Sequence, residues 1–337
     1  MIRNFFINLF FIIPVWIINF IYKLNKDIKR EYIFDAQSKF LFALMPKFDL
    51  HLIEDDEIPK VRDLINQRRK NIRMASKTKK KVKTIDHLIG EDNNLLIREY
   101  LPYKTDNDNI ILYFHGGGYV LNSVDTHDPT VSYFSEKLRT KIFSLEYSLS
   151  PENKFPKALE EANIAFNWLI NNGYSKEQII ICGDSAGAHL AASLLHDLKA
   201  RDEELPFLQV LIYPMVSPSL NFPSLERLGE NFLLTKEQMK WFWHYFRAEE
   251  SNNLDSRFDL LKIDNNNKFD TKTVIITAGF DPLCDEAEAY AAKLNDMGNN
   301  VKQIHYPSLF HGFINITRLK TAKLATIDIL REIKRNI

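Results

Sequence analysis

The sequence predicts an α/β protein whose mostly parallel sheet carries helices on both faces, and two observations lead to this class. From residue 83 onward, short apolar runs rich in Ile and Val alternate with segments of helix length. Continuous runs of this kind are typical of strands buried on both faces of a parallel sheet, and the alternation itself is the pattern of an α/β architecture. The 337 residues suffice for one large domain with an insertion or for two modest domains.

The strands are expected in the following order. TIDHLI and NLLIREYL flank the turn residues GEDN, which indicates a hairpin over residues 84–101. Six further strands are predicted for the apolar runs at 110–114, 142–147, 179–182, 208–213, 274–277 and 301–306. The last six make up the buried part of the predicted sheet.

The first thirty residues are strongly hydrophobic. Residues 4–22 carry no charge, which is near the minimum length for a membrane-spanning helix. We expect residues 1–30 to be a membrane anchor that contacts lipid, and the heavier basic flank over 23–30 places the rest of the chain on the cytoplasmic side. A helix in the membrane plane and a hydrophobic helix packed over the mouth of the functional site remain open. No small-residue cleavage site follows, which disfavours a signal peptide.

Charge is distributed unevenly although the net charge is zero. Residues 1–90 hold 18 Lys and Arg against 10 Asp and Glu, so the remainder holds 26 (44 − 18) against 34 (44 − 10). This excess near the N-terminus favours an anionic membrane surface as partner, while nucleic acid is not expected because no nucleic-acid-binding motif occurs. Residues 31–82 are predicted to be a helical cap or linker segment, with a helix beginning near Ile58.

One interval breaks the alternation of strands and helices. No strand signal occurs between Tyr213 and Thr273, and within this interval lies LTKEQMKWFWHYFRAEE. Thr235 and Gln238 match a capping box at a helix start, and the following helix is aromatic nearly all round, which is typical of a buried helix. We therefore predict one large α/β domain over 83–337 with a cap insertion at about 214–268.

The sharpest chemical motif is Gly183-Asp184-Ser185-Ala186-Gly187, which joins an apolar run to a helix-like segment. A serine on such a strand–turn–helix elbow stands clear of the sheet as a nucleophile. The glycines remove side chains that would collide with neighbouring elements. Ser185 is therefore the predicted nucleophile.

A second motif, YFHGGGYV, follows the run at 110–114. Three consecutive glycines are costly in backbone entropy, and either a tight turn or an oxyanion hole explains them. We predict that the N–H groups of Gly116 and Gly117, together with that of Ala186, bind the oxyanion. His115 is expected to brace the loop.

A serine nucleophile needs a histidine base and a carboxylate that orients the histidine. Along chains with this elbow, the acid follows the serine, and the histidine follows the acid. Asp281 comes just after the strand at 274–277 and is the predicted acid, with Asp285 as the rival. His311 follows the last strand and is the predicted base, whereas His305 lies within that strand.

These blocks resemble the hormone-sensitive-lipase-like family of carboxylesterases, in the subgroup with GDSAG. The likeness covers residues 60–337 and includes, in the family's order, HGGGYVLNSVDTHD, EYSLSPENKFPKALEEA, GDSAGAHLAA, LIYP, TAGFDPLCDEAEAYA and HGF. It implies an α/β-hydrolase fold with a mostly parallel eight-stranded sheet, helices on both faces and a helical cap. It also implies a serine carboxylesterase or lipase that hydrolyses short to medium acyl esters. The implied roles are those assigned above to Ser185, Asp281 and His311, acting through an acyl-enzyme without metal or cofactor.

Several alternatives stay open. An amidase or a deacetylase would use the same triad, and a non-catalytic binding protein could use the same scaffold. Four aromatic residues are predicted to line an apolar substrate pocket, although packing within the cap explains them equally well: Tyr119, Trp241, Trp243 and Phe246. The partner is expected to be a small-molecule ester, and a homodimer is also open.

The two cysteines, Cys182 and Cys284, are too few for a disulfide framework and form no metal-binding motif. Each is expected to be unpaired. Cys284 stands where the family usually carries Arg, which gives the neighbouring Asp285 a different partner.

Overall fold

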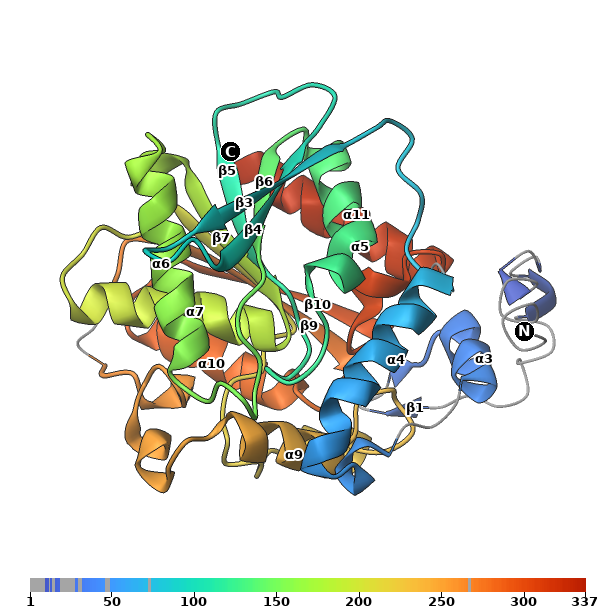
Figure 1. Cartoon of the computed structure of the whole chain (residues 1–337). Coiled ribbons are helices and arrows are strands. Elements are labelled where there is room, and N and C mark those ends of the chain that lie inside the picture. Colours follow the sequence, from blue (N-terminus) through green and yellow to red (C-terminus); the bar gives the residue numbers. More distant parts are fainter. Residues whose placement is uncertain are drawn as a thin grey trace.

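An eight-stranded sheet forms the centre of the computed structural model, which describes residues 10, 11, 13, 16–18, 28, 29, 32–45, 49–71, 74–265 and 268–337 (Figure 1). The strand order is β10-β9-β8-β7-β5-β6-β4-β3. β4 runs antiparallel to both of its neighbours, and every other pair is parallel. The strands are β3 (Lys83–Ile89), β4 (Leu95–Leu101), β5 (Ile110–Phe114), β6 (Lys141–Leu145), β7 (Ile179–Asp184), β8 (Leu208–Ile212), β9 (Lys272–Phe280) and β10 (Val301–Phe310).

The hairpin and the six further strands predicted from the sequence are confirmed, as is the mostly parallel α/β class. β9 and β10 extend beyond their predicted ends, to Phe280 and Phe310. These extensions carry each strand up to the residue before Asp281 and before His311, so the sheet itself delivers both side chains to one edge.

Helices cover both faces of the sheet (Figure 1). Successive side chains of β5 enter two different clusters, with Leu112 on one face and Tyr113 on the other. One face is covered by α5 (Val124–Leu138) and α11 (Lys320–Asn336), the other by α6 (Lys157–Asn171), α7 (Ala186–Ala200) and α10 (Cys284–Asp296). Short 3-10 turns precede β7 at η3 (Lys176–Gln178) and follow β10 at η6 (Phe313–Ile316).

The N-terminal elements pack at the end of the sheet where Asp281 and His311 lie. They are β1 (Ile28–Lys29), β2 (Tyr32–Ile33), α3 (Ala36–Leu44), η1 (Leu50–Leu52), η2 (Asp55–Glu57) and α4 (Ile58–Asn71). Arg62 fastens α4 to the domain, because its guanidinium donates to the carbonyls of Val120 (2.7 Å) and Ser150 (2.6 Å) and to the carboxylate of Glu152.

Most of residues 4–22, on which the predicted membrane anchor falls, lies outside the described residues. Of those described, Phe10 and Ile18 are buried, and the Phe10 ring lies 5.3 Å from that of Phe40 in α3. No helix in the described part of the chain has both the length and the apolar character needed to cross a bilayer. The anchor stays a prediction.

In the interval between β8 and β9, the residues that the structure describes form helices and turns but no strand. They are α8 (Pro223–Leu228), α9 (Lys236–Phe246), η4 (Glu250–Leu254) and η5 (Leu260–Lys262). The predicted capping box is present, since Gln238 N–H donates to Thr235 Oγ1 (3.1 Å) and Thr235 N–H donates to Gln238 Oε1 (3.0 Å). α9 lies against η1, and the Tyr245 hydroxyl donates to Asp55, so the insertion and the N-terminal segment touch.

The chain returning from this interval is bonded to α7 by three consecutive carbonyl groups. His196 Nδ1 donates to the carbonyl of Ser256 (2.8 Å), Ser193 Oγ to that of Arg257 (2.6 Å), and His189 Nε2 to that of Phe258 (2.9 Å). Residues 189, 193 and 196 lie on one face of a helix. The polar row therefore satisfies backbone acceptors that would otherwise be buried without partners.

Candidate active site

Ser185 occupies a strained turn between β7 and α7. Its φ of 57° and ψ of −119° lie in a region that non-glycine residues rarely adopt, so the surrounding structure must enforce it. Its N–H donates to the Ile212 carbonyl (2.9 Å). A Cβ atom on Gly183 would lie 2.3 Å from the Gly187 carbonyl carbon, and one on Gly187 would lie 2.0 Å from the Phe114 oxygen. Both flanking glycines are therefore required by close backbone approach.

Ser185, His311 and Asp281 form one chain of hydrogen bonds. His311 Nε2 lies 2.9 Å from Ser185 Oγ, and His311 Nδ1 lies 2.8 Å from Asp281 Oδ2. Asp281 is 1% exposed and His311 is 8% exposed. Because a carboxylate only accepts hydrogen bonds, Nδ1 donates to Asp281, and Nε2 is left to accept the proton of the serine hydroxyl. The structure thus brings together three residues that lie up to 126 positions apart in sequence.

The rival residues have other partners. Asp285 belongs to α10 and pairs with Arg227 of α8 at 3.5 Å. We expected Asp285 to have a different partner from that in the family, because Cys284 stands where the family carries Arg. His305 lies within β10, where its Nδ1 is 2.9 Å from the Thr277 hydroxyl. Neither side chain is part of the hydrogen-bonded chain at Ser185.

The glycine loop corrects one sequence-based assignment. The Gly116 N–H donates to Asp184 Oδ1 at 3.0 Å, so it is not available to bind an oxyanion. Within the described residues, the N–H groups of Gly117, Gly118 and Ala186 have no acceptor. The positive φ angles of Gly117 (140°) and Gly118 (62°) fit a loop that turns its amides outward. The available donor set is therefore Gly117, Gly118 and Ala186.

Asp184 is the buried centre that holds this loop. Besides the Gly116 N–H, it accepts hydrogen bonds from the Tyr113 hydroxyl (2.7 Å) and from Asn315 Nδ2 (3.2 Å), and His127 Nε2 lies 3.4 Å away. Burial alone would raise the pKa of Asp184, but these partners outweigh burial and hold the pKa below its usual range. The carboxylate therefore stays charged and fixes the loop to the serine turn.

His115 braces the loop from the other side, as predicted. Its ring stacks on that of Tyr147 at 4.3 Å, and the Tyr147 hydroxyl donates to the His115 carbonyl at 2.6 Å. Neither contact reaches the serine hydroxyl, so His115 serves the position of the loop.

The four aromatic residues predicted to line a substrate pocket are packed against other aromatic side chains. Tyr119 stacks on Phe246 with ring centres 3.6 Å apart, and its hydroxyl is bonded to His189 Nδ1. Trp243 is 1% exposed and contacts the rings of His189 and Phe258. Trp241 is buried beside Phe242 and Tyr245. These contacts favour the packing interpretation over a lining role.

Phe242 is the aromatic residue that sequence reasoning missed. A Cβ atom on Gly118 would lie 2.0 Å from Phe242 Cδ1, so the ring rests directly on the glycine loop. The aromatic signal of α9 was visible in the sequence, but which of its rings faces the loop depends on how the helix is placed.

A second aromatic group lies behind the acid and the base. The Phe34 ring is 4.8 Å from that of Phe280, and the Phe42 ring is 4.8 Å from that of Phe310. Phe280 and Phe310 directly precede Asp281 and His311, so the N-terminal segment supports the ends of both strands.

Comparison with known proteins places this geometry in a family. A family model described as alpha/beta hydrolase fold matches residues 111–315. An ethyl acetate hydrolase from Pseudomonas putida is 31% identical over 67% of this chain and 73% of its own length. The carboxylic ester hydrolase LipN from Mycobacterium tuberculosis is 34% identical over 68% of this chain and 64% of its own length.

A solved structure shares the arrangement in three dimensions. A hyperthermophilic esterase from Pyrobaculum calidifontis superimposes with a TM-score of 0.77 at 29% identity, covering 88% of this chain and 96% of that one. Together with the serine turn and the glycine loop, these likenesses show that the chain belongs to the hormone-sensitive-lipase-like family of carboxylic ester hydrolases with the α/β-hydrolase fold.

Proposed function

We propose that this protein hydrolyses esters of short to medium acyl chains, with Ser185 as nucleophile, His311 as base and Asp281 as orienting acid. The observation that carries this proposal is the continuous chain of hydrogen bonds, at 2.9 Å and 2.8 Å, that ends on a serine held at a positive φ. An imidazole in this position can take the hydroxyl proton, while the carboxylate stabilises the resulting imidazolium.

The reaction proceeds in two halves. His311 removes the Ser185 proton as Oγ attacks the ester carbonyl, and the N–H groups of Gly117, Gly118 and Ala186 bind the oxyanion. His311 then protonates the leaving alcohol. Water attacks the acyl-enzyme by the same route and releases the acid, which restores the serine. Each oxyanion donor contributes about 3–4 kcal/mol to such a transition state.

Replacement of the serine tests the mechanism. Ser185→Ala should abolish hydrolysis of p-nitrophenyl butyrate and labelling by a fluorophosphonate probe, with an unchanged melting temperature. Ser251→Ala, at an exposed serine in η4, is the matched control and should keep both properties. Hydrolysis retained by folded Ser185→Ala would refute the assignment.

The nature of the scissile bond needs a separate measurement. A series of p-nitrophenyl esters from acetate to laurate, paired with the corresponding p-nitroanilides, compares ester and amide at equal acyl length. We expect faster turnover of the esters, with a maximum at short or medium acyl length. Faster turnover of the anilides would instead support an amidase, and probe labelling without turnover would support a deacetylase with another substrate.

We also propose that the cap combines residues 31–82 with the insertion 214–268. Support comes from the hydrogen bond between Tyr245 and Asp55 and from the packing of α9 on η1. Phe242 then borders the space in front of Ser185 from the cap side, through its contact with Gly118.

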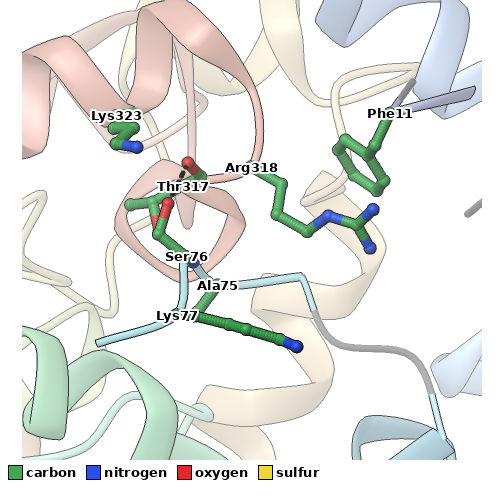
Figure 2. Close-up of a pocket in the computed structure, with 7 residues that line it drawn as sticks. All are labelled: Phe11, Ala75, Ser76, Lys77, Thr317, Arg318 and Lys323. Carbon is green, nitrogen blue, oxygen red and sulfur yellow. Dashed lines mark hydrogen bonds between the residues drawn. The ribbon is translucent and has the colours of Figure 1, made fainter. Parts of the chain in front are cut away.

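The last part of the proposal is that residues 1–30 attach the protein to a membrane, with the catalytic domain on the cytoplasmic side. The uncharged stretch 4–22 supports it. A basic pocket of about 620 Å³ beside Phe11 supports it further, because Lys77, Arg318 and Lys323 line it (Figure 2). The Arg318 guanidinium lies over the Phe11 ring at 4.0 Å, so basic groups lie beside this residue of the hydrophobic stretch.

Vesicle binding tests this attachment. The full chain should co-sediment with vesicles of phosphatidylglycerol and phosphatidylcholine, and Lys77→Gln combined with Lys323→Gln should weaken this binding. Lys104→Gln, at an exposed lysine away from the pocket, is the control. Recovery of the full chain in the supernatant at every lipid composition would contradict the attachment. A reporter fused to the catalytic domain would establish on which side of the membrane this domain lies.

A further inference from the structure

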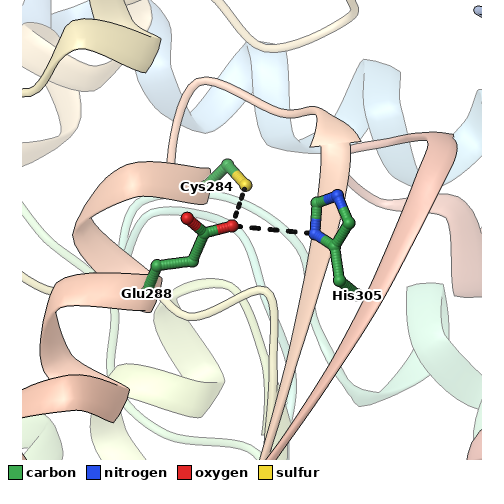
Figure 3. A group of neighbouring side chains, drawn as sticks. All are labelled: Cys284, Glu288 and His305. Carbon is green, nitrogen blue, oxygen red and sulfur yellow. Dashed lines mark hydrogen bonds and ion pairs between the residues drawn. The ribbon is translucent and has the colours of Figure 1, made fainter. Parts of the chain in front are cut away.

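Three side chains with metal-binding atoms meet behind the acid loop, although no motif in the sequence predicted a metal. Cys284 and Glu288 lie four residues apart on α10, and His305 reaches them from β10 (Figure 3). Cys284 Sγ is 3.1 Å from Glu288 Oε1, and His305 Nδ1 is 3.7 Å from the same oxygen. One ligand atom from each residue lies within 4.8 Å of the other two.

These separations are close to those of a tetrahedral zinc site. With Zn–N and Zn–O distances of about 2.0 Å and a Zn–S distance of about 2.3 Å, tetrahedral angles separate ligand atoms by about 3.3–3.6 Å. The pair of thiol and carboxylate oxygen (3.1 Å) and the pair of carboxylate oxygen and imidazole nitrogen (3.7 Å) already stand near this separation, and the thiol sulfur lies within 4.8 Å of the imidazole nitrogen. Thr277 Oγ1 lies 2.9 Å from His305 Nδ1, so an ion there would replace this hydrogen bond as well as the one between Cys284 and Glu288.

The surroundings suit a borderline-soft ion. Cys284 is the first residue of α10, where the helix end favours a thiolate. The Cys284 side chain is buried, while the side chains of His305 and Glu288 are 23% and 35% exposed, so an ion can enter from their side. Thiolate, imidazole and carboxylate together are ligands that zinc accepts, whereas calcium and magnesium prefer oxygen alone.

We propose that Cys284, Glu288 and His305 form a zinc-binding site with its fourth position open to water. Binding displaces the proton of the Cys284 thiol, which passes to solvent, and leaves the His305 proton on Nε2. This binding does not depend on the proposed esterase mechanism.

The site would connect the two segments that carry the acid and the base. The Cys284 N–H donates to the Asp281 carbonyl at 3.1 Å, and β10 continues from His305 to the residue before His311. A bound ion would therefore fix α10 to β10 just behind the hydrogen-bonded pair. This consequence, unlike the binding itself, rests on the proposed function.

Cobalt substitution tests the site directly. The full chain, stripped with a chelator, is titrated with Co²⁺, and we expect one ion per chain with a thiolate-to-cobalt charge-transfer band in the near ultraviolet. Zn²⁺ should abolish the band and raise the melting temperature, because it binds only the folded state. Cys284→Ser should remove the band, and His305→Gln should weaken Zn²⁺ binding at least about tenfold.

Matched controls separate this site from the other candidates. His87→Gln removes another histidine beside a carboxylate, at 2.9 Å from Glu99, but in a place without cysteine. Cys182→Ala removes the other cysteine of the chain. Both variants should bind Zn²⁺ as the unmodified chain does. Ser185→Ala should also bind Zn²⁺ normally, which would show that metal binding does not depend on the proposed esterase reaction. Absence of the charge-transfer band, or equal Zn²⁺ affinity in folded His305→Gln, would overturn the proposal.

Discussion

The ring of Phe242 rests on the backbone of Gly118, so closely that a single Cβ atom at residue 118 would lie 2.0 Å from Phe242 Cδ1. Phe242 belongs to α9, and Gly118 belongs to the loop with the free amides. The position of α9 and the geometry of the proposed oxyanion donors are therefore linked by one contact. A glycine at 118 serves this contact as well as the positive φ of the loop.

Gly118→Ala should lower kcat for p-nitrophenyl butyrate by at least about tenfold, because the new methyl group displaces either the loop or the ring. Adding Phe242→Ala should restore part of the loss by removing the clash. Gly173→Ala is the matched control, since residue 173 also has a positive φ (90°) but open space around its Cβ position. Equal losses at 118 and 173 would mean that backbone strain, and not the Phe242 contact, limits the enzyme.

Asp184→Asn should destabilise the protein by roughly 3–5 kcal/mol, since it removes the charge from a buried group surrounded by donors. The free energy of unfolding in urea measures this loss. kcat should fall as well, because asparagine keeps one acceptor oxygen but presents an NH2 group to a neighbouring donor, which disturbs the position of the Gly116 amide. Asp125→Asn, at a carboxylate with 55% exposure that pairs with Arg98, should change stability by less than about 1 kcal/mol. A variant at 184 as stable as the unmodified chain would contradict the anchoring role.

Acid should unfold the protein through His189 and His196. Burial lowers the pKa of each to about 4, from about 6.5 in an unfolded chain. The unfolded state then binds more protons, so stability is complete above pH 6.5 and falls as the pH drops toward 4. Each histidine contributes on the order of 3 kcal/mol to this fall. Urea unfolding between pH 7 and pH 4 measures the slope, which His196→Asn should reduce; an unchanged slope would exclude His196 as a source.

Glu286 should act in the opposite direction. Burial, reinforced by the nearby charges of Asp281 and Asp259, raises the pKa of Glu286 well above its usual range, although the Val216 N–H opposes the shift. The folded state holds a proton on Glu286 that the unfolded state has already released. The contribution of Glu286 to the free energy of unfolding is therefore present at low pH and is lost as the pH rises. Glu286→Gln keeps an acceptor for the Val216 N–H, which donates to Oε1 at 2.7 Å.

Glu286→Gln should therefore match the unmodified chain near pH 5 and exceed its free energy of unfolding at pH 8. Glu160→Gln, at a carboxylate on the surface of α6, should leave the two pH curves parallel. Parallel curves for the residue 286 variant would show that the buried carboxyl is not the group that titrates.

The sheet could be predicted from the sequence because its strands are buried on both faces and therefore read as continuous apolar runs. The same logic located Ser185, Asp281 and His311, since each follows a strand end and parallel strands bring these ends to one edge. The extra length of β9 and β10 was not visible, because their last residues include Gly279, Pro307 and Ser308, which carry no strand signal.

The identity of the free amides could not be read from three consecutive glycines. Which N–H groups are available depends on the partner of Gly116, and that partner, Asp184, lies 68 residues away. The contact of Phe242 with Gly118 could not be predicted for a similar reason. α9 carries several aromatic residues in a row, and only the placement of the helix decides which of their rings contacts the glycine loop. Arg227 as the partner of Asp285 required the placement of α8, for which the sequence holds no local pattern.

The three consecutive carbonyls of Ser256, Arg257 and Phe258, each held by a side chain of α7, set a boundary for engineering. Residues beyond this point are part of the scaffold that carries the serine, although in sequence they belong to the insertion. A chimera that takes its acyl-binding elements from another esterase should join before Ser256. A junction after η5 would leave His189, Ser193 and His196 with a foreign backbone, and a change of specificity would then be confounded by damage to the nucleophile helix.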